Sequence, residues 1–84
     1  MKTLASRIQR MLLRQLMNGL PMANARVGCV EVFLTREPGR FAWVVMTDGD
    51  PPQHAGSDAN LHLAVEDAAG AAAQLMWRAS TRAA

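Results

Sequence analysis

Three arginines at helical spacing form the first candidate binding surface in this sequence. Arg7, Arg10 and Arg14 recur every three or four residues, so a helix carries them on one face. Arginine makes forked contacts with phosphates and carboxylates, and such a face can bind nucleic acid, an acidic protein or an anionic membrane surface. No aromatic residue interleaves with them, so stacking on a single nucleic-acid strand is not supported. The alternative is a solvated helix face without a ligand.

Trp77 is the second candidate. It falls on the polar side of a predicted Ala-rich helix, beside Gly70 and Ala73. A tryptophan exposed among small residues is typical of an anchor in a protein interface. In the alternative interpretation, the indole folds over the edge of the sheet or under the first helix. We expect Trp43 in the core instead, on the same face of a strand as Phe41.

An acidic loop offers a third kind of chemistry. Asp48, Asp50 and His54 supply oxygen and imidazole groups, but a calcium loop needs more oxygen ligands and structural zinc needs four ligands at close spacing. We therefore favour a solvated turn over a metal site or an enzymatic site. Cys29 is predicted to lie in the middle of a strand, as a small core residue rather than a reactive thiol. We expect no catalytic residue, no cofactor and no metal, and hence no enzyme.

Length and composition limit the remaining classes. The 84 residues allow a single domain, and 50% hydrophobic against 19% charged residues excludes a disordered tail. One cysteine excludes an internal disulfide framework, and no apolar run approaches the roughly 18 residues of a membrane span. Residues 1–42 carry seven basic and two acidic side chains, whereas residues 43–84 carry two and five. Because arginines interrupt the apolar start, we expect no secretory signal and a cytoplasmic protein.

The first 20 residues are predicted to be a basic amphipathic segment, in which the helix itself covers residues 3–18. Its apolar face consists of Leu4, Ile8, Met11, Leu12 and Leu16. Asn18-Gly19 and the following Pro21 end the helix, since glycine accepts a left-handed cap and proline cannot continue the helix. Residues 22–26 are interpreted as a short linker.

The middle of the chain is predicted to form an antiparallel sheet over residues 27–56. Residues 27–35 and 40–47 are rich in branched and aromatic residues, which favours two strands. Pro38-Gly39 between them suits a type II turn, so the two strands form a hairpin. A third short strand is possible near residues 53–55. Because the hairpin is apolar on both faces, we expect a second layer or a partner subunit, and a homodimer is the natural hypothesis.

The end of the chain is predicted to form a second helix over residues 58–80, with its regular part at 60–79. Ser57, Asp58 or Asn60 can cap its start. Its apolar stripe consists of Leu61, Val65, Ala68, Ala72, Leu75, Met76 and Ala79. The expected architecture is an α+β two-layer domain that spans residues 1–84, with a hairpin or a three-stranded sheet and both helices on one face.

Two families share features with residues 39–76. Gly39-Arg40-Phe41, an Asp-Gly-Asp-Pro turn, Gly56-Ser57 and the helix start at residues 60–68 resemble the N-terminal domain of HicB-type antitoxins. The same helix is similar to the last helix of double-stranded RNA-binding domains through Ala64, Ala68, Ala69 and Ala72. Those domains run helix, three strands, helix, and their first helix contacts the RNA minor groove. The resemblance implies this fold and a regulatory role.

We therefore expect a small non-catalytic regulatory protein that acts by protein–protein binding, similar to a stand-alone antitoxin or a phage-type inhibitor. Trp77 is the expected anchor, and Arg7, Arg10 and Arg14 are the expected charged contact with the partner protein. The alternative is a nucleic-acid-binding module that uses the same arginine face. A third hypothesis, an enzyme at the acidic loop, has the least support.

Overall fold

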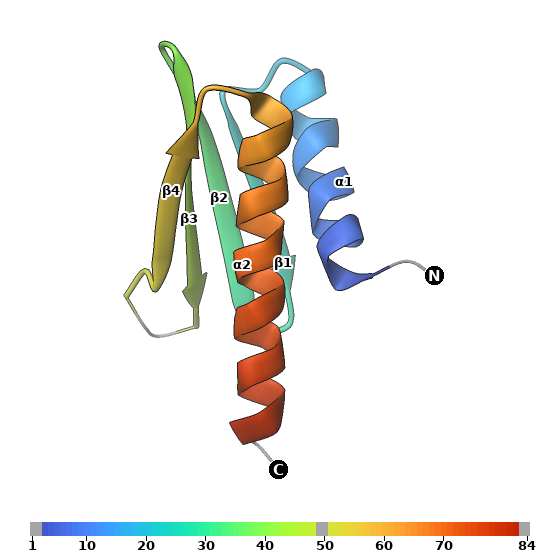
Figure 1. Cartoon of the computed structure of the whole chain (residues 1–84). Helices are drawn as coiled ribbons and strands as arrows, with labels where there is room; N and C mark the ends of the chain where they lie inside the picture. The colour runs from blue at the N-terminus through green and yellow to red at the C-terminus, as the bar shows by residue number, and fades with distance from the viewer. Residues whose placement is uncertain (1–2, 49–50, 83–84) are drawn as a thin grey trace.

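The chain folds into a four-stranded antiparallel sheet with two helices (Figure 1). The structure is a computed structural model that describes residues 3–48 and 51–82. Its elements are α1 (Leu4–Met17), β1 (Met22–Val27), β2 (Val30–Glu37), β3 (Arg40–Thr47), β4 (His54–Asp58) and α2 (Leu61–Arg82). The predicted α+β class is confirmed. None of the helices in the described part of the chain is long and apolar enough to cross a membrane.

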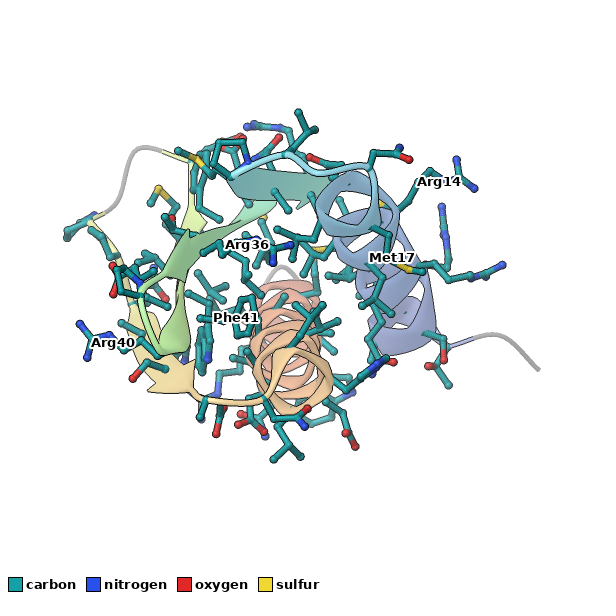
Figure 2. All side chains as sticks on the ribbon, turned by 90° about the horizontal axis from the view of Figure 1, so that it is seen from above. Arg14, Met17, Arg36, Arg40 and Phe41 are labelled. Carbon is teal, nitrogen blue, oxygen red and sulfur yellow. The ribbon has the colours of Figure 1, made fainter. Side chains whose placement is uncertain are left out.

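The strands lie in chain order, β1-β2-β3-β4, and each pairs with its neighbour in the antiparallel sense. The predicted hairpin is confirmed, since β2 and β3 pair along their whole length from Glu37↔Arg40 to Val30↔Thr47. Gly39 at its turn has a φ of +77°, the value that a type II turn requires after proline. The predicted third short strand exists as β4. Both helices cover the same face of the sheet (Figure 2).

Two predictions about the chain between the first helix and the hairpin are wrong. Residues 22–26, interpreted as a linker, belong to strand β1, which pairs with β2 from Met22↔Thr35 to Val27↔Val30. The predicted strand at residues 27–35 is divided because Gly28 adopts a φ of +60° and turns the chain. Cys29 therefore lies in the β1–β2 turn, half-buried, rather than in the middle of a strand. The apolar residues on both sides of Gly28 favoured one continuous strand, whereas Gly28 accepts a positive φ and forms a turn.

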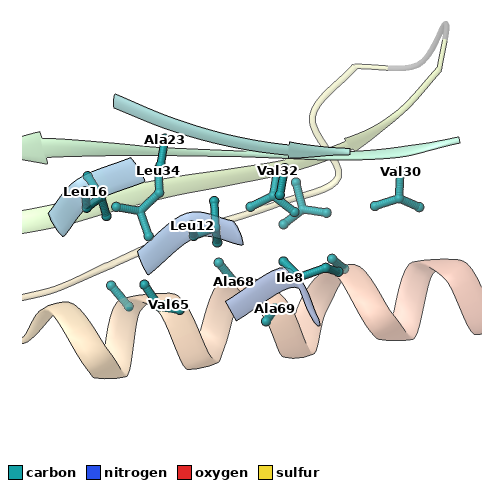
Figure 3. Packing of buried hydrophobic residues seen from close by; sticks show 14 of the residues in the cluster. Ile8, Leu12, Leu16, Ala23, Val30, Val32, Leu34, Val65, Ala68 and Ala69 are labelled. Atoms are coloured by element: carbon teal, nitrogen blue, oxygen red, sulfur yellow. The ribbon is translucent and has the colours of Figure 1, made fainter. Parts of the chain in front are cut away.

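The core lies between the sheet and the two helices (Figure 3). Helix α1 contributes Ile8, Leu12 and Leu16, and the sheet contributes Ala23, Ala25, Val30, Val32, Leu34 and Val45. Helix α2 contributes Ala64, Val65, Ala68, Ala69, Ala72 and Leu75. Four alanines on this face let the backbone of α2 approach the sheet closely. The predicted stripe is confirmed up to Met76; the side chain of Ala79 lies outside the described residues.

Polar side chains fix both ends of α1 and the start of α2. The hydroxyl of Thr3 accepts a hydrogen bond of 3.1 Å from the Ser6 backbone N–H, and Asn60 accepts one of 3.2 Å from Leu63. Arg36 donates a hydrogen bond of 3.1 Å to the Leu16 carbonyl, one of the last carbonyls of α1. Its guanidinium also lies 5.5 Å from the centre of the Phe41 ring (Figure 2). Arg36 is therefore a structural residue.

Candidate functional site

The arginine face of α1, which we define as Arg7, Arg10 and Arg14, is exposed to solvent. The three side chains and Met11 line a shallow depression of about 240 Å³. Helix α1 turns this face outward because Ile8, Leu12 and Leu16 occupy its opposite side. Within the described residues, none of the three guanidinium groups forms an ion pair. Arg14 and Met17 both point away from the core (Figure 2).

Trp77 is 70% exposed, although tryptophan is usually a largely buried residue. The helix phase explains this position, because Leu75 and Met76 turn toward the core and direct Trp77 outward. Trp77 lines a depression of about 440 Å³ together with Ala73, Gln74 and Arg78. The prediction that Trp77 lies on the outer side of the helix is confirmed, and Trp43 packs against the core as expected.

The structure does not bring the two predicted surfaces into one site. The depression at the arginine face and the depression at Trp77 share no lining residue and lie on different helices. The two helices run in opposite directions, and the C-terminal half of α2 extends past the start of α1 (Figure 1). A partner that contacts both surfaces must therefore span the helical side of the molecule.

The acidic loop takes part in an ion-pair network. Arg26 pairs with Asp48 at 2.5 Å and with Glu31 at 3.5 Å, and Asn24 donates a hydrogen bond of 2.9 Å to Glu31. His54 lies in β4, opposite Val45, and Asp50 lies outside the described residues. Over residues 3–48 and 51–82, no three histidine, cysteine or acidic side chains lie close enough together to hold a metal ion.

The start of α2 and the end of β4 bring two carboxyl groups together, an arrangement that the sequence did not indicate. A hydrogen bond from protonated Asp58 to Asp67, with burial and the charge of Asp67, raises the pKa of Asp58. The two residues are nine positions apart, and only the reversal of the chain between β4 and α2 makes them neighbours. Asp58 is on the helical face of β4, opposite Phe41.

Trp43 and Gly56 form a close cross-strand pair on the helical face. A Cβ atom at Gly56 would come within 2.7 Å of Cζ2 and 2.9 Å of Cε2 of the Trp43 indole. The ring therefore occupies the space above the glycine. The indole Nε1 of Trp43 is buried, and no described group accepts a hydrogen bond from it. The packing of the Trp43 indole thus requires a residue without a side chain at position 56.

The sheet has one face that neither helix covers. Its centre consists of the half-buried side chains of Phe33, Ala42, Val44 and Met46. The ion-pair network of Arg26 borders this apolar centre on one side. The sequence predicted a hairpin that is apolar on both faces, and the structure agrees with that prediction.

Comparison of the chain with protein-family models, with curated protein sequences and with solved structures finds no match.

Proposed function

We propose that this chain is a non-catalytic regulatory protein that acts by binding another protein, with Trp77 as the anchor. The observation that carries the proposal is the 70% exposure of Trp77 beside a depression of about 440 Å³. Tryptophan is enriched among the residues that dominate binding energy in protein interfaces, because its large apolar surface packs into a pocket of the partner. Because Trp77 is 70% exposed, most of the free energy that burial of an indole can contribute remains to be gained by contact with a partner.

The arginine face supplies the charged contact in this proposal. Three guanidinium groups on one side of α1, none of them in an ion pair with a described residue, attract an acidic surface and increase the rate of encounter. Met11 between them is 38% exposed and adds an apolar contact. An acidic protein whose surface covers the helical side of the molecule fits both features.

The second candidate function is nucleic-acid binding through the arginine face. The same three guanidinium groups, which form no ion pair with any described residue, favour it. Three arginines neutralise about three phosphates, so affinity should fall with salt at a slope of about −3 on logarithmic axes. In this case Trp77 takes no part in binding the nucleic acid, because it lies on α2 and the arginine face lies on α1.

An affinity capture from a host lysate separates the two functions. The wild-type chain is compared with Trp77→Ala and with Leu63→Ala, both with and without nuclease and at two salt concentrations. Leu63 is a matched control because it is 52% exposed on the same helix. We expect one protein partner that survives nuclease and high salt, that Leu63→Ala retains and that Trp77→Ala loses.

The opposite results contradict the proposal. A prey that disappears after nuclease, or nucleic acid that elutes with salt, supports the arginine face as a nucleic-acid site. Retention of the protein partner by Trp77→Ala removes Trp77 as the anchor. Melting temperatures of the three proteins control for folding, and we expect them to agree within a few degrees because both side chains are mostly exposed.

A further inference from the structure

Strand β4 forms one edge of the sheet, and its outer side faces no other described element (Figure 1). An edge strand presents unpaired backbone N–H and C=O groups, which can pair with another strand. Three of the five residues of β4 are Ala55, Gly56 and Ser57. Their small side chains leave the approach to the backbone open. No lysine or proline, residues that commonly block an edge, occurs within the strand.

We propose that two copies of this chain pair through their β4 strands, antiparallel and around a two-fold axis at Gly56. The two sheets then form one continuous sheet. Gly56 is the middle residue of the strand, so this register uses all five residues of both copies. The proposal goes beyond the binding of another protein and does not depend on it, because Trp77 lies on α2 and takes no part in the pairing.

Charge complementarity selects the register. In the pairing centred on Gly56, His54 lies opposite the partner's Asp58, and Ala55 lies opposite the partner's Ser57. His54 and Asp58 both point to the helical face, since they pair with Val45 and Phe41 of β3. The symmetry gives two imidazole–carboxylate pairs per dimer. A shift of the axis by one residue to Ala55 or Ser57 removes both pairs.

The surroundings of Asp58 favour the same arrangement. Asp58 lies beside Asp67, and two neighbouring carboxyl groups repel each other once both are ionised. The partner's His54 would place a hydrogen-bond donor, cationic when protonated, next to this acidic pair. Because two five-residue strands bury less than the roughly 1,000 Å² of a stable interface, the dimer should be weak and concentration-dependent.

Sedimentation equilibrium measures the association of the whole chain from about 10 µM to about 1 mM. The wild type is compared with variants that swap the charges of His54 and Asp58. We expect His54→Asp to weaken the dimer by about tenfold, because like charges then face each other twice. The double variant His54→Asp, Asp58→His restores opposite charges in the same register and should recover dimerisation. Met17→Asp is the control, since it introduces a negative charge at an exposed position of α1, which packs against β1 at the other edge of the sheet.

Three results would overturn the pairing. These are a monomer over the whole concentration range, a dimer that His54→Asp leaves unchanged, and a double variant that remains as weak as His54→Asp. Melting temperatures show that each variant is folded. If the double variant dimerises again, the weaker dimer of His54→Asp was caused by the unfavourable charges and not by a general loss of structure. A monomeric chain that still captures a protein partner through Trp77 leaves the proposed function intact and contradicts only the β4 pairing.

Discussion

The two edges of the sheet differ in how their backbone groups are satisfied. At β1, the side-chain amide of Gln15 takes the place of a neighbouring strand. Its Nε2 donates a hydrogen bond of 2.6 Å to the Asn24 carbonyl, and its Oε1 accepts one of 3.0 Å from the Asn24 N–H. At β4, no described side chain makes such a contact with the backbone of residues 54–58.

The difference follows from the position of the helices. Helix α1 packs against β1 (Figure 1), and Gln15 on the side of this helix therefore reaches the edge of the sheet. Helix α2 contacts β2, β3 and β4 from the helical face and leaves the outer side of β4 open. One amide can thus close an edge strand against pairing. The comparison explains why β4, and not β1, is the edge that we propose for pairing with a second copy.

The largest effect on stability is expected from Gly56→Ala, which disturbs the packing of the open edge strand β4. A Cβ atom would lie 2.7 Å from the Trp43 indole, so the ring or the strand must move. We expect a loss of about 1–3 kcal/mol in the free energy of unfolding, measured by urea denaturation. Ser57→Ala is the matched control, because Ser57 is exposed on the other face of the same strand. Equal stability of Gly56→Ala and wild type would show that the pocket above the glycine is not tightly packed.

A smaller effect is expected from Gln15→Ala, which opens the closed edge. The variant loses both hydrogen bonds to the backbone of Asn24. We expect a loss of about 1–2 kcal/mol in the free energy of unfolding and faster hydrogen exchange at the Asn24 amide. Gln74→Ala is the control, since Gln74 is exposed on α2. Unchanged exchange at Asn24 would show that the glutamine does not protect the edge.

The smallest effect is expected from Asp67→Asn. Because Asp67 raises the pKa of Asp58 above 3.8, the folded state binds this proton more tightly than the unfolded state does. The resulting stabilisation is present below pH 3.8 and is lost as the pH rises through the raised pKa of Asp58. Asp67→Asn should therefore be more stable than wild type at neutral pH, and this difference should shrink in acid.

An NMR titration of the Asp58 carboxyl carbon checks the cause of this effect. We expect its pKa to fall toward the ordinary value of an aspartate in Asp67→Asn. Glu66→Gln is the control, because Glu66 is an exposed neighbour of Asp67 on the same helix. A pKa that Asp67→Asn leaves unchanged would remove Asp67 as the cause.

Local signals in the sequence predicted much of the fold. Pro38 fixes its own φ and Gly39 accepts a positive φ, so the hairpin turn could be located without knowledge of the rest of the chain. The spacing of apolar residues in α2 defined its buried stripe and, by exclusion, the outward direction of Trp77. These features depend on neighbours a few residues apart, which a sequence shows directly.

The features that the sequence did not predict depend on contacts between distant segments. Residues 22–26 form a strand because β2 offers them a partner, and their own composition does not favour a strand strongly. Gln15 lies on a helix flank, and only the packing of α1 beside β1 shows that it closes an edge. The contact between Asp58 and Asp67 likewise needs the fold, since it joins a strand to a helix.

The role of Trp77 as the anchor for a protein partner is tested most directly by site-specific photo-crosslinking. Gln74→benzoylphenylalanine places the probe in the same depression and keeps Trp77, while Leu63→benzoylphenylalanine is the control on the same helix. We expect a nuclease-resistant crosslink to one protein from position 74 and none from position 63. A crosslink from position 63 alone, or to nucleic acid, would contradict the proposed function.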